Sequence, residues 1–259
     1  MSESIPCRLL EWDSEFFGFR IARVDGGRLT TKKMRDILAW CEENFIECLY
    51  FLADSDHMDT LRLAERHQFS LVDIRVELQR SISGPLAHAT LSSTGAFQTR
   101  RFLPGDIPSL KEIARQSITG SRFFSDPCFS KDASHSLYEA WVEKSCQGYA
   151  DQVLVSAGIN QKNDPVSGFI TCHLPTADSG GTIGLLGTAV DFQGQGVGRA
   201  LVNAALDWFG ANGVGDVKVV TQGQNIKAQR LYQSSGFITH TQKLWYHKWF
   251  AACDVALRH

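Results

Sequence analysis

Apolar positions recur along the chain with two periods. Short apolar runs of strand length alternate with longer segments that carry an apolar residue every three or four positions. In the first 80 residues the short runs predict strands at 21–24, 48–53 and 69–78. The longer segments predict a helix that begins at Thr30 or Thr31 and a second helix at 56–67. The first helix is predicted to bury one stripe of residues: Met34, Ile37, Leu38, Cys41 and Phe45. Residues 7–19 are predicted to begin as a strand and to end in an aromatic loop.

The same alternation continues after residue 99. The apolar runs predict strands at 99–103, 153–157, 168–173, 182–190, 217–222 and 237–250. Two helices are predicted to begin at Asp106 and Ser130, and two more lie at 196–211 and 225–235. Because strands and helices alternate in both halves, the pattern predicts an α/β or α+β protein with a sheet at its centre.

Residues 81–98 interrupt this alternation with a stretch rich in Ser, Thr, Gly, Ala and Pro. Such a composition is typical of a linker. We therefore predict an N-terminal domain at 1–80, a linker at 81–98 and a second domain at 99–259.

The two predicted domains share a short sequence pattern. Leu61-Arg-Leu-Ala64 followed by Phe69 is similar to Gln229-Arg-Leu-Tyr232 followed by Phe237, and a strand comes next in both places. Two explanations remain open: a duplication whose first half lost its chemistry, or a chance recurrence of helix, phenylalanine and strand.

A glycine-rich turn stands between the strand at 182–190 and the helix at 196–211. It reads Gln193-Gly194-Gln195-Gly196-Val197-Gly198. A turn of this kind at the start of a helix presents unpaired N–H groups at the positive end of the helix dipole, which suits a diphosphate. A dinucleotide-binding turn would have Gly-x-Gly-x-x-Gly spacing and an acidic residue about 20 positions later. The spacing Gly-x-Gly-x-Gly disfavours that interpretation.

Composition narrows the possible functions. The chain has 259 residues, of which 43% are hydrophobic and 21% charged, with a formal net charge of −2. No basic field predicts binding to nucleic acid, and no apolar run is long enough to predict a membrane span. The first residues lack the pattern of a signal peptide, so we expect a cytoplasmic location. The seven cysteines include no Cys-x-x-Cys pair, so no metal site is predicted and most thiols are expected to be reduced and buried.

Two motifs together resemble the GNAT family of acetyltransferases. Gln193, Gly196 and Gly198 fit its acetyl-CoA motif, and Asn225, Lys227-Ala228, Leu231-Tyr232 and Gly236-Phe237 fit its downstream motif. The resemblance implies a GNAT fold, in which a mixed, mostly antiparallel sheet has two parallel central strands that splay apart. It also implies that the first 80 residues are a smaller α/β domain similar to a degenerate half of the same fold.

The resemblance further implies acetyl-CoA as co-substrate and a set of residues that bind it: Ala189, Val190, Gln193, Gly194, Gln195, Gly196, Val197, Gly198, Arg199 and Asn225. Ala189 and Val190 would lie at the thioester, where an amide near Val190 would polarise the carbonyl. Tyr232 would protonate the departing thiolate, with Asn225 as a second catalytic residue. Alternatively, Tyr232 is a half-buried helix tyrosine and Asn225 an N-cap. His173 and Asp126 are candidates for the general base.

Residues 121–127 form an unusual segment with two adjacent aromatics, an Arg and an Asp before a Pro. One interpretation is a hydrophobic lid held by an ion pair. The other is an acceptor site made of Ser121, Arg122, Phe123 and Asp126, with Arg122 on a phosphate. Residues 121–150 resemble the GNAT enzymes that acetylate dTDP-4-amino-4,6-dideoxygalactose, which favours a nucleotide-sugar acceptor and a role in polysaccharide synthesis.

Other functions remain open on the sequence. The acceptor is alternatively a protein N-terminus, an amino acid or a polyamine, or the chain is a non-catalytic protein that binds acyl-CoA. A homodimer is compatible with the sequence but is not indicated by any motif.

Overall fold

The computed structural model describes residues 6–82, 97–158, 165–176 and 180–250. Within these ranges ten strands form one sheet with the order β1-β2-β3-β10-β4-β9-β8-β7-β6-β5. Most neighbouring strands are antiparallel, and two pairs are parallel, β2 with β3 and β8 with β9. The GNAT fold class is thus confirmed in its main feature, a mixed and mostly antiparallel sheet.

The first half contains four strands and three helices. They are β1 (Cys7–Leu9), α1 (Glu11–Phe17), β2 (Ile21–Val24), α2 (Thr31–Glu43), β3 (Cys48–Asp54), α3 (Met58–Arg66) and β4 (Ser70–Ser81). Thr30 caps α2 by accepting a hydrogen bond from the Lys33 amide, as the sequence predicts.

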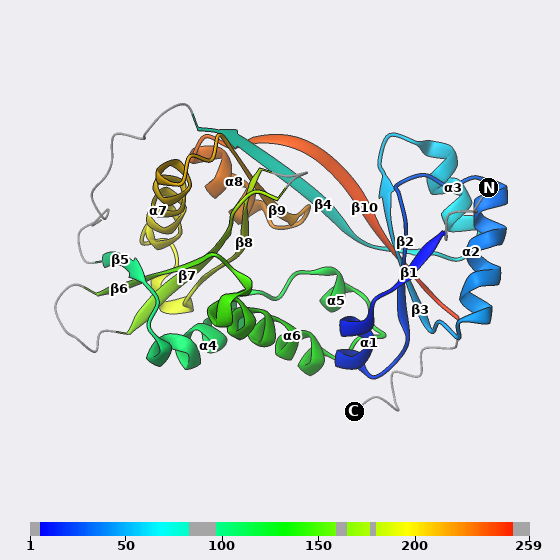
Figure 1. Ribbon diagram of the computed structural model, residues 1–259, viewed down its shortest axis with the longest axis horizontal. Helices are drawn as coiled ribbons and strands as arrows, with labels where there is room; N and C mark the ends of the chain where they lie inside the picture. The colour runs from blue at the N-terminus through cyan, green and yellow to red at the C-terminus, as the bar shows by residue number, and fades with distance from the viewer. Residues whose placement is uncertain (1–5, 83–96, 159–164, 177–179, 251–259) are drawn as a thin grey trace.

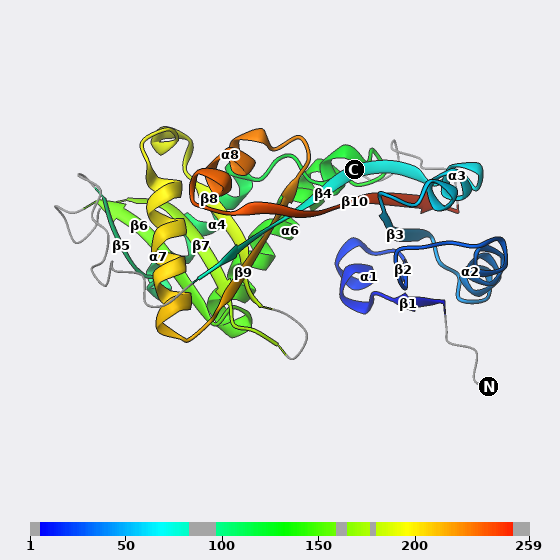
Figure 2. The same ribbon diagram turned by 90° about the horizontal axis from the view of Figure 1, so that it is seen from above.

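The second half carries the remaining strands, helices and short turns. They are β5 (Phe97–Arg101), η1 (Pro104–Asp106), α4 (Ile107–Ser117), α5 (Arg122–Ser125), α6 (Lys131–Lys144), η2 (Ser145–Tyr149), β6 (Gln152–Gly158), β7 (Val166–His173), β8 (Gly181–Thr188), η3 (Val190–Phe192), α7 (Val197–Ala211), β9 (Asp216–Gln222), α8 (Ile226–Ser234) and β10 (Ile238–Trp249). Helix α7 covers one face of this part of the sheet, whereas α4 and α6 lie on the other (Figure 2).

Strands β4 and β10 join the two halves. They pair with each other along most of their length and run from one half of the molecule into the other (Figure 1). Strand β10 also pairs with β3, and β4 also pairs with β9. The segment 81–98 therefore does not separate two sheets; most of it lies outside the described residues, and the domain division stays a prediction.

The repeated sequence pattern corresponds to a repeated topology. In the first half β2, α2, β3, α3 and β4 follow one another with β2 parallel to β3. In the second half β8, α7, β9, α8 and β10 do the same with β8 parallel to β9. The Phe69 amide donates to the Ala64 carbonyl at 3.0 Å, and the Phe237 amide donates to the Tyr232 carbonyl at 3.0 Å. The structure thus supports a duplication over a chance recurrence.

Three local expectations are wrong. Residues 11–17 form a helix, which ends because Gly18 adopts a left-handed conformation. The Phe45 side chain is 77% exposed because α2 ends at Glu43, and Phe45 itself has a φ of 53° beyond that end. Residues 122–125 form one helical turn, where the sequence predicts a loop.

Candidate active site

The parallel strands β8 and β9 part after three residue pairs. They are in register at Gly181–Val217, Thr182–Lys218 and Ile183–Val219, and no pair follows although both strands continue. Beyond this point the β8 edge that faces β9 offers backbone N–H and C=O groups without a strand partner. Gly184, Leu185 and Leu186 on one side and Val220, Thr221 and Gln222 on the other line a cleft of about 1370 Å³. That volume exceeds the 300–1,000 Å³ that is usual for a small-molecule pocket.

The glycine-rich turn closes one end of this cleft. Gly194 and Gly196 have φ values of 77° and 87°, which glycine adopts without strain. A Cβ on Gly198 would lie 3.1 Å from the Leu231 side chain, so small size matters at this position for a different reason. Gln193, Gly194, Gly196, Val197, Gly198 and Arg199 all line the cleft.

Helix α7 begins without a side-chain cap. Its N-cap is Gly196, and the first hydrogen bond of the helix runs from the Ala200 amide to the Gly196 carbonyl. The preceding amides of the first turn therefore point out of the helix without a helical acceptor. Arg199, Lys227 and Arg230 add positive charge along the cleft. Together these groups suit a ligand with several phosphates.

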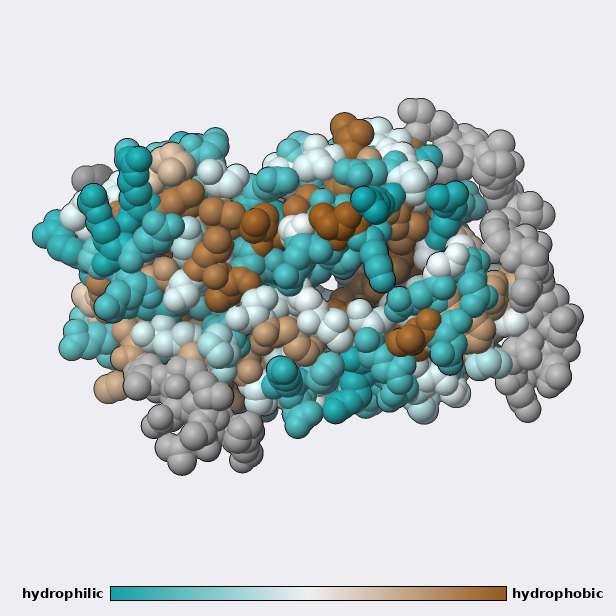
Figure 3. Space-filling model, turned by 180° about the vertical axis from the view of Figure 1, so that it is seen from behind, coloured by the Kyte–Doolittle hydropathy of each residue, from teal (hydrophilic) through white to brown (hydrophobic). Residues whose placement is uncertain are grey.

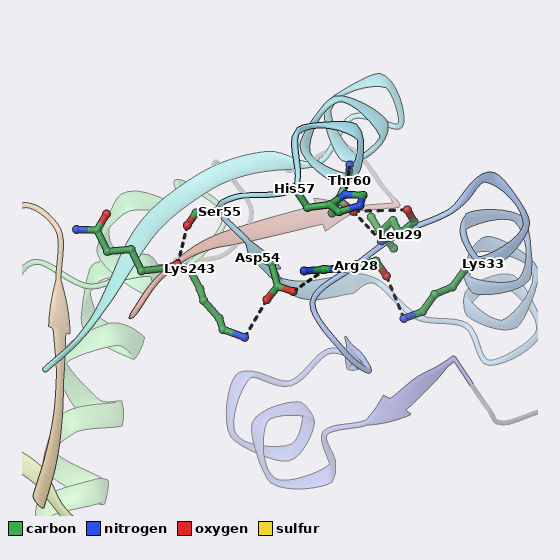
Figure 4. Close-up of polar contacts among 9 residues, drawn as sticks. Arg28, Leu29, Lys33, Asp54, Ser55, His57, Thr60 and Lys243 are labelled. Carbon is green, nitrogen blue, oxygen red and sulfur yellow. Dashed lines mark hydrogen bonds and ion pairs between the residues drawn. The ribbon is translucent and has the colours of Figure 1, made fainter. Parts of the chain in front are cut away.

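In the first half, side chains occupy the turn that corresponds to the glycine-rich turn (Figure 4). Side chains from the surrounding elements fill the turn before α2. The Lys33 ammonium of α2 donates to the Asp25 carbonyl at 2.5 Å and to the Arg28 carbonyl at 3.3 Å. The Leu29 amide donates to the Thr60 hydroxyl at 2.9 Å. The Asp54 carboxylate lies against Gly27 and accepts from Lys243 at 2.9 Å. The first half therefore keeps the scaffold and closes the position that corresponds to the glycine-rich turn.

Two predicted catalytic residues meet in the cleft of the second half. Asn225 caps α8, since its side-chain oxygen accepts from the Ala228 amide at 3.1 Å, and it also lines the cleft. Tyr232 lines the cleft as well and is 4% exposed, with its ring against Phe237. Burial raises the pKa of Tyr232, so the phenol stays protonated throughout the neutral range.

The predicted thioester residues lie at the margin. Ala189 and Val190 do not line the cleft, because β8 ends at Thr188 and 190–192 form a 3₁₀ turn. Gln195 of the glycine-rich turn does not line the cleft either. The Ala189 amide donates to the Ser167 carbonyl at 2.9 Å. Their contact with acetyl-CoA stays a prediction, and the β8 residues that line the cleft are Gly184, Leu185, Leu186 and Thr188.

The residues of segment 121–127 differ in how far the structure exposes them. Arg122 lies partly exposed, whereas Phe123 and Asp126 are 1% and 3% exposed. Phe123 packs among aromatic side chains, and the Asp126 carboxylate accepts from the Trp249 indole at 3.0 Å and lies 2.7 Å from His247 Nδ1. For Phe123 and Asp126 this favours the structural interpretation, with His247 and Trp249 as the partners of Asp126. Ser121 is 4% exposed, and its buried hydroxyl has no hydrogen-bond partner in the described part of the chain.

Asp73 on β4 is a carboxylate that the sequence reasoning missed. Asp73 does not itself line the cleft, but the next residue is bonded to its rim: the Gly223 amide, between the cleft residues Gln222 and Gln224, donates to the Ile74 carbonyl at 2.7 Å. Burial raises the pKa of Asp73 to about 6, although the amides of Ile74 and Arg122 donate to its carboxylate and the charge of Arg122 stabilises the anion. The pKa of Tyr138 in the cleft wall is raised mainly by burial and in part by the charge of Asp73. A signal was present, since Asp is depleted in strands.

His173, which the sequence analysis names with Asp126 as a candidate general base, lies outside the cleft. Its ring is 5.4 Å from that of Tyr149, and it does not line the cleft.

Within the described ranges no helix is long and apolar enough to cross a membrane. In the same part of the chain no group of three or more His, Cys, Asp or Glu residues is arranged to hold a metal ion.

Comparison with known proteins identifies relatives of this chain. Residues 121–237 match the model of the acetyltransferase (GNAT) family. The chain is 28% identical to a dTDP-fucosamine acetyltransferase of Escherichia coli O6:H1 over 92% of its own length and 96% of that protein. It is 28% identical to the spore coat polysaccharide biosynthesis protein SpsD of Bacillus subtilis, over 56% of this chain and 48% of the relative. A mycothiol acetyltransferase of Stackebrandtia nassauensis is 25% identical over 85% of this chain and 66% of its own.

Solved structures agree on the fold. A GCN5-related N-acetyltransferase from Sphaerobacter thermophilus superimposes with a TM-score of 0.64 and 16% identity, covering 94% of this chain and 76% of the other. A tandem GNAT protein of the clavulanic acid pathway superimposes with a TM-score of 0.61 and 12% identity, covering 88% and 75%. The family model, which matches residues 121–237, identifies this part of the chain as an acetyltransferase domain of the GNAT family.

Proposed function

We propose that the protein transfers the acetyl group of acetyl-CoA to the 4-amino group of a dTDP-linked 4-amino-4,6-dideoxyhexose. The observation that carries this proposal is the similarity to a dTDP-fucosamine acetyltransferase along nearly the whole chain, first half included. The similarity to a polysaccharide biosynthesis protein supports a product used in cell-surface polysaccharide. The cleft supports it too, because its volume allows a large cofactor and part of an acceptor together.

In the proposed mechanism the turn at 193–199 holds the diphosphate of acetyl-CoA, and the free edge of β8 pairs with its pantetheine arm. This alignment brings the thioester next to the acceptor amine. The Asp73 carboxylate takes a proton from the amine, which attacks the thioester carbonyl as the C–N bond forms. Tyr232 donates its proton to the sulfur as the C–S bond breaks. The products are the 4-acetamido sugar and CoA, and one proton passes from Asp73 back to the phenolate through solvent.

The acceptor is expected to approach Asp73 from the side of Arg122. Gly120 lines the cleft, accepts a hydrogen bond from Gln224 at 2.9 Å, and is two residues from Arg122. This short separation supports the proposed contact of Arg122 with the acceptor.

A CoA-release assay tests this function. With dTDP-4-amino-4,6-dideoxygalactose we expect a kcat/KM at least about 100-fold above that with amino acids, peptide N-termini or polyamines, a ratio that corresponds to about 2.7 kcal/mol of transition-state binding. Equal rates with one of the simpler amines would assign the enzyme to that acceptor. Binding of acetyl-CoA with no release by any amine would favour a protein that only binds acyl-CoA.

A further inference from the structure

Two arginines stack on Trp245 of β10, and further arginines lie near them. The guanidinium carbon of Arg122 lies 4.3 Å from the centre of the Trp245 ring, and that of Arg23 lies 5.1 Å from it. The pKa of Arg23 is lowered first by burial and then by the positive charges of Arg8, Arg122 and Arg75. Arg75 lies two residues from Asp73 on β4, and Asp73 stands opposite Trp245 on β10, so Arg75 lies on the same face of the sheet near this pair.

This positive charge is only partly balanced by the protein, since the carboxylates of Asp13 and Asp73 feel the charge of Arg122 without forming an ion pair with it. Among the described residues neither Arg23 nor Arg122 has a carboxylate oxygen within 4.0 Å, and the buried Nε of Arg122 has no hydrogen-bond partner. Arg8 pairs with Asp25 at 3.7 Å and Arg75 pairs with Glu77 at 3.2 Å. Like charges that are held close together lower the stability of the fold. Binding of an anionic ligand would offset this loss.

The positions of these arginines relative to Asp73 match the shape of one class of ligand. Asp73 and Arg75 are two residues apart on β4, so their side chains leave the same face of the sheet about 6.6 Å apart. Trp245 stands opposite Asp73 in the register of β10 with β4. In a hexose with an amine on C4 and a diphosphate on C1, the two groups lie on opposite sides of the ring. An amine beside Asp73 therefore places the diphosphate among the arginines.

We propose that the first half of the chain, which has closed its own cofactor position, supplies the site for the diphosphate of a nucleotide-linked acceptor. Arg23 and Arg75 come from the first half, and Arg122 comes from the second. Planar guanidinium groups bind phosphate oxygens in pairs, and stacking on Trp245 fixes the orientation of two of them before the ligand arrives. The surface is hollowed near the centre of the molecule, between the two halves (Figure 3). This inference rests on the proposed function for the identity of the acceptor, but not for the binding of its diphosphate.

Calorimetric titration of the whole chain with dTDP tests the site without any acetyl transfer. We expect dTDP to bind and thymidine, which has no phosphate, to bind at least about 10-fold more weakly. Arg23→Gln should weaken dTDP at least about 10-fold, and Arg23→Lys should weaken it less, because the charge remains. Both variants should bind acetyl-CoA within about twofold of the wild type, which also shows that they are folded. Arg62→Gln is the matched control, because Arg62 is 64% exposed on α3 and should change nothing.

The outcomes separate this site from the proposed function. Loss of dTDP binding in Arg23→Gln, together with no acetylation of dTDP-amino sugars, would keep the diphosphate site and reject the acceptor. Acetylation of those sugars with dTDP binding unchanged in Arg23→Gln would keep the function and overturn the site. No binding of dTDP to the wild type would also overturn it.

Discussion

Replacing Tyr232 with phenylalanine is expected to lower kcat about 100-fold, which is the lower end of the range for loss of a general acid. The substitution removes one hydroxyl from a side chain that is buried and lines the cleft, so the fold and the cofactor site should be preserved. Because the pKa of Tyr232 is raised by burial, its proton is present throughout the neutral range, and the loss should be similar from pH 6 to 9. Steady-state kinetics of CoA release at saturating substrates measure this effect.

Tyr246→Phe is the matched control for that experiment. Tyr246 is also buried, but its hydroxyl donates to Glu65 of α3 at 3.2 Å, and neither residue lines the cleft. We expect kcat to stay within about twofold of the wild type. If Tyr232→Phe lowers kcat by less than about 10-fold, under about 1.4 kcal/mol of barrier, then Tyr232 is not the acid.

Replacing Asp73 with asparagine is expected to lower kcat/KM for the acceptor about 100-fold at pH 7.5. The amide oxygen still accepts hydrogen bonds from the Ile74 and Arg122 amides, whereas the proton acceptor is lost. In the wild type the pKa of Asp73 is about 6, so the carboxylate becomes available as the pH rises through 6 and kcat/KM should rise with it. In Asp73→Asn this rise near pH 6 should be absent. The pH profile of kcat/KM measures both effects.

Asp13→Asn controls for the loss of a carboxylate near Arg122. The pKa of Asp13 is also raised by burial and lowered by the charge of Arg122, yet Asp13 lies on α1, whereas Asp73 lies on β4 next to Ile74, whose carbonyl is bonded to Gly223 at the rim of the cleft. Its substitution should leave the rise near pH 6 in place. Retention of that rise in Asp73→Asn, or a loss of activity below about threefold, would remove Asp73 from the mechanism.

The sequence predicted the second half of the fold well because its signals are local. The turn at 193–198 needs glycine for its backbone angles, and Asn225 caps its own helix, so both features can be recognised within a few residues. The pairing of β10 with β3 and β4 could not be predicted in this way. It joins segments nearly 200 residues apart, and the apolar pattern of a strand does not specify its partner.

The acceptor side of the site could likewise be predicted only in part from local sequence signals. Arg122 was found from residue types within a short segment. Asp73 and Arg23 became candidates only when the fold brought β4 and β2 to the face that α5 covers. Phe123 and Asp126 carry the same signals as Arg122, but burial and the contact with His247 occupy them in the core. A sequence motif does not show which side chain of a segment points to the ligand.

A crystal structure of the chain with acetyl-CoA or CoA tests the central claim most directly. The account predicts diphosphate oxygens about 3 Å from the backbone nitrogens of the turn at 194–199. It also predicts the pantetheine arm between β8 and β9, the sulfur beside the Tyr232 hydroxyl, and one cofactor per chain. A cofactor bound elsewhere, or a sulfur remote from Tyr232 with the gap between β8 and β9 empty, would contradict it.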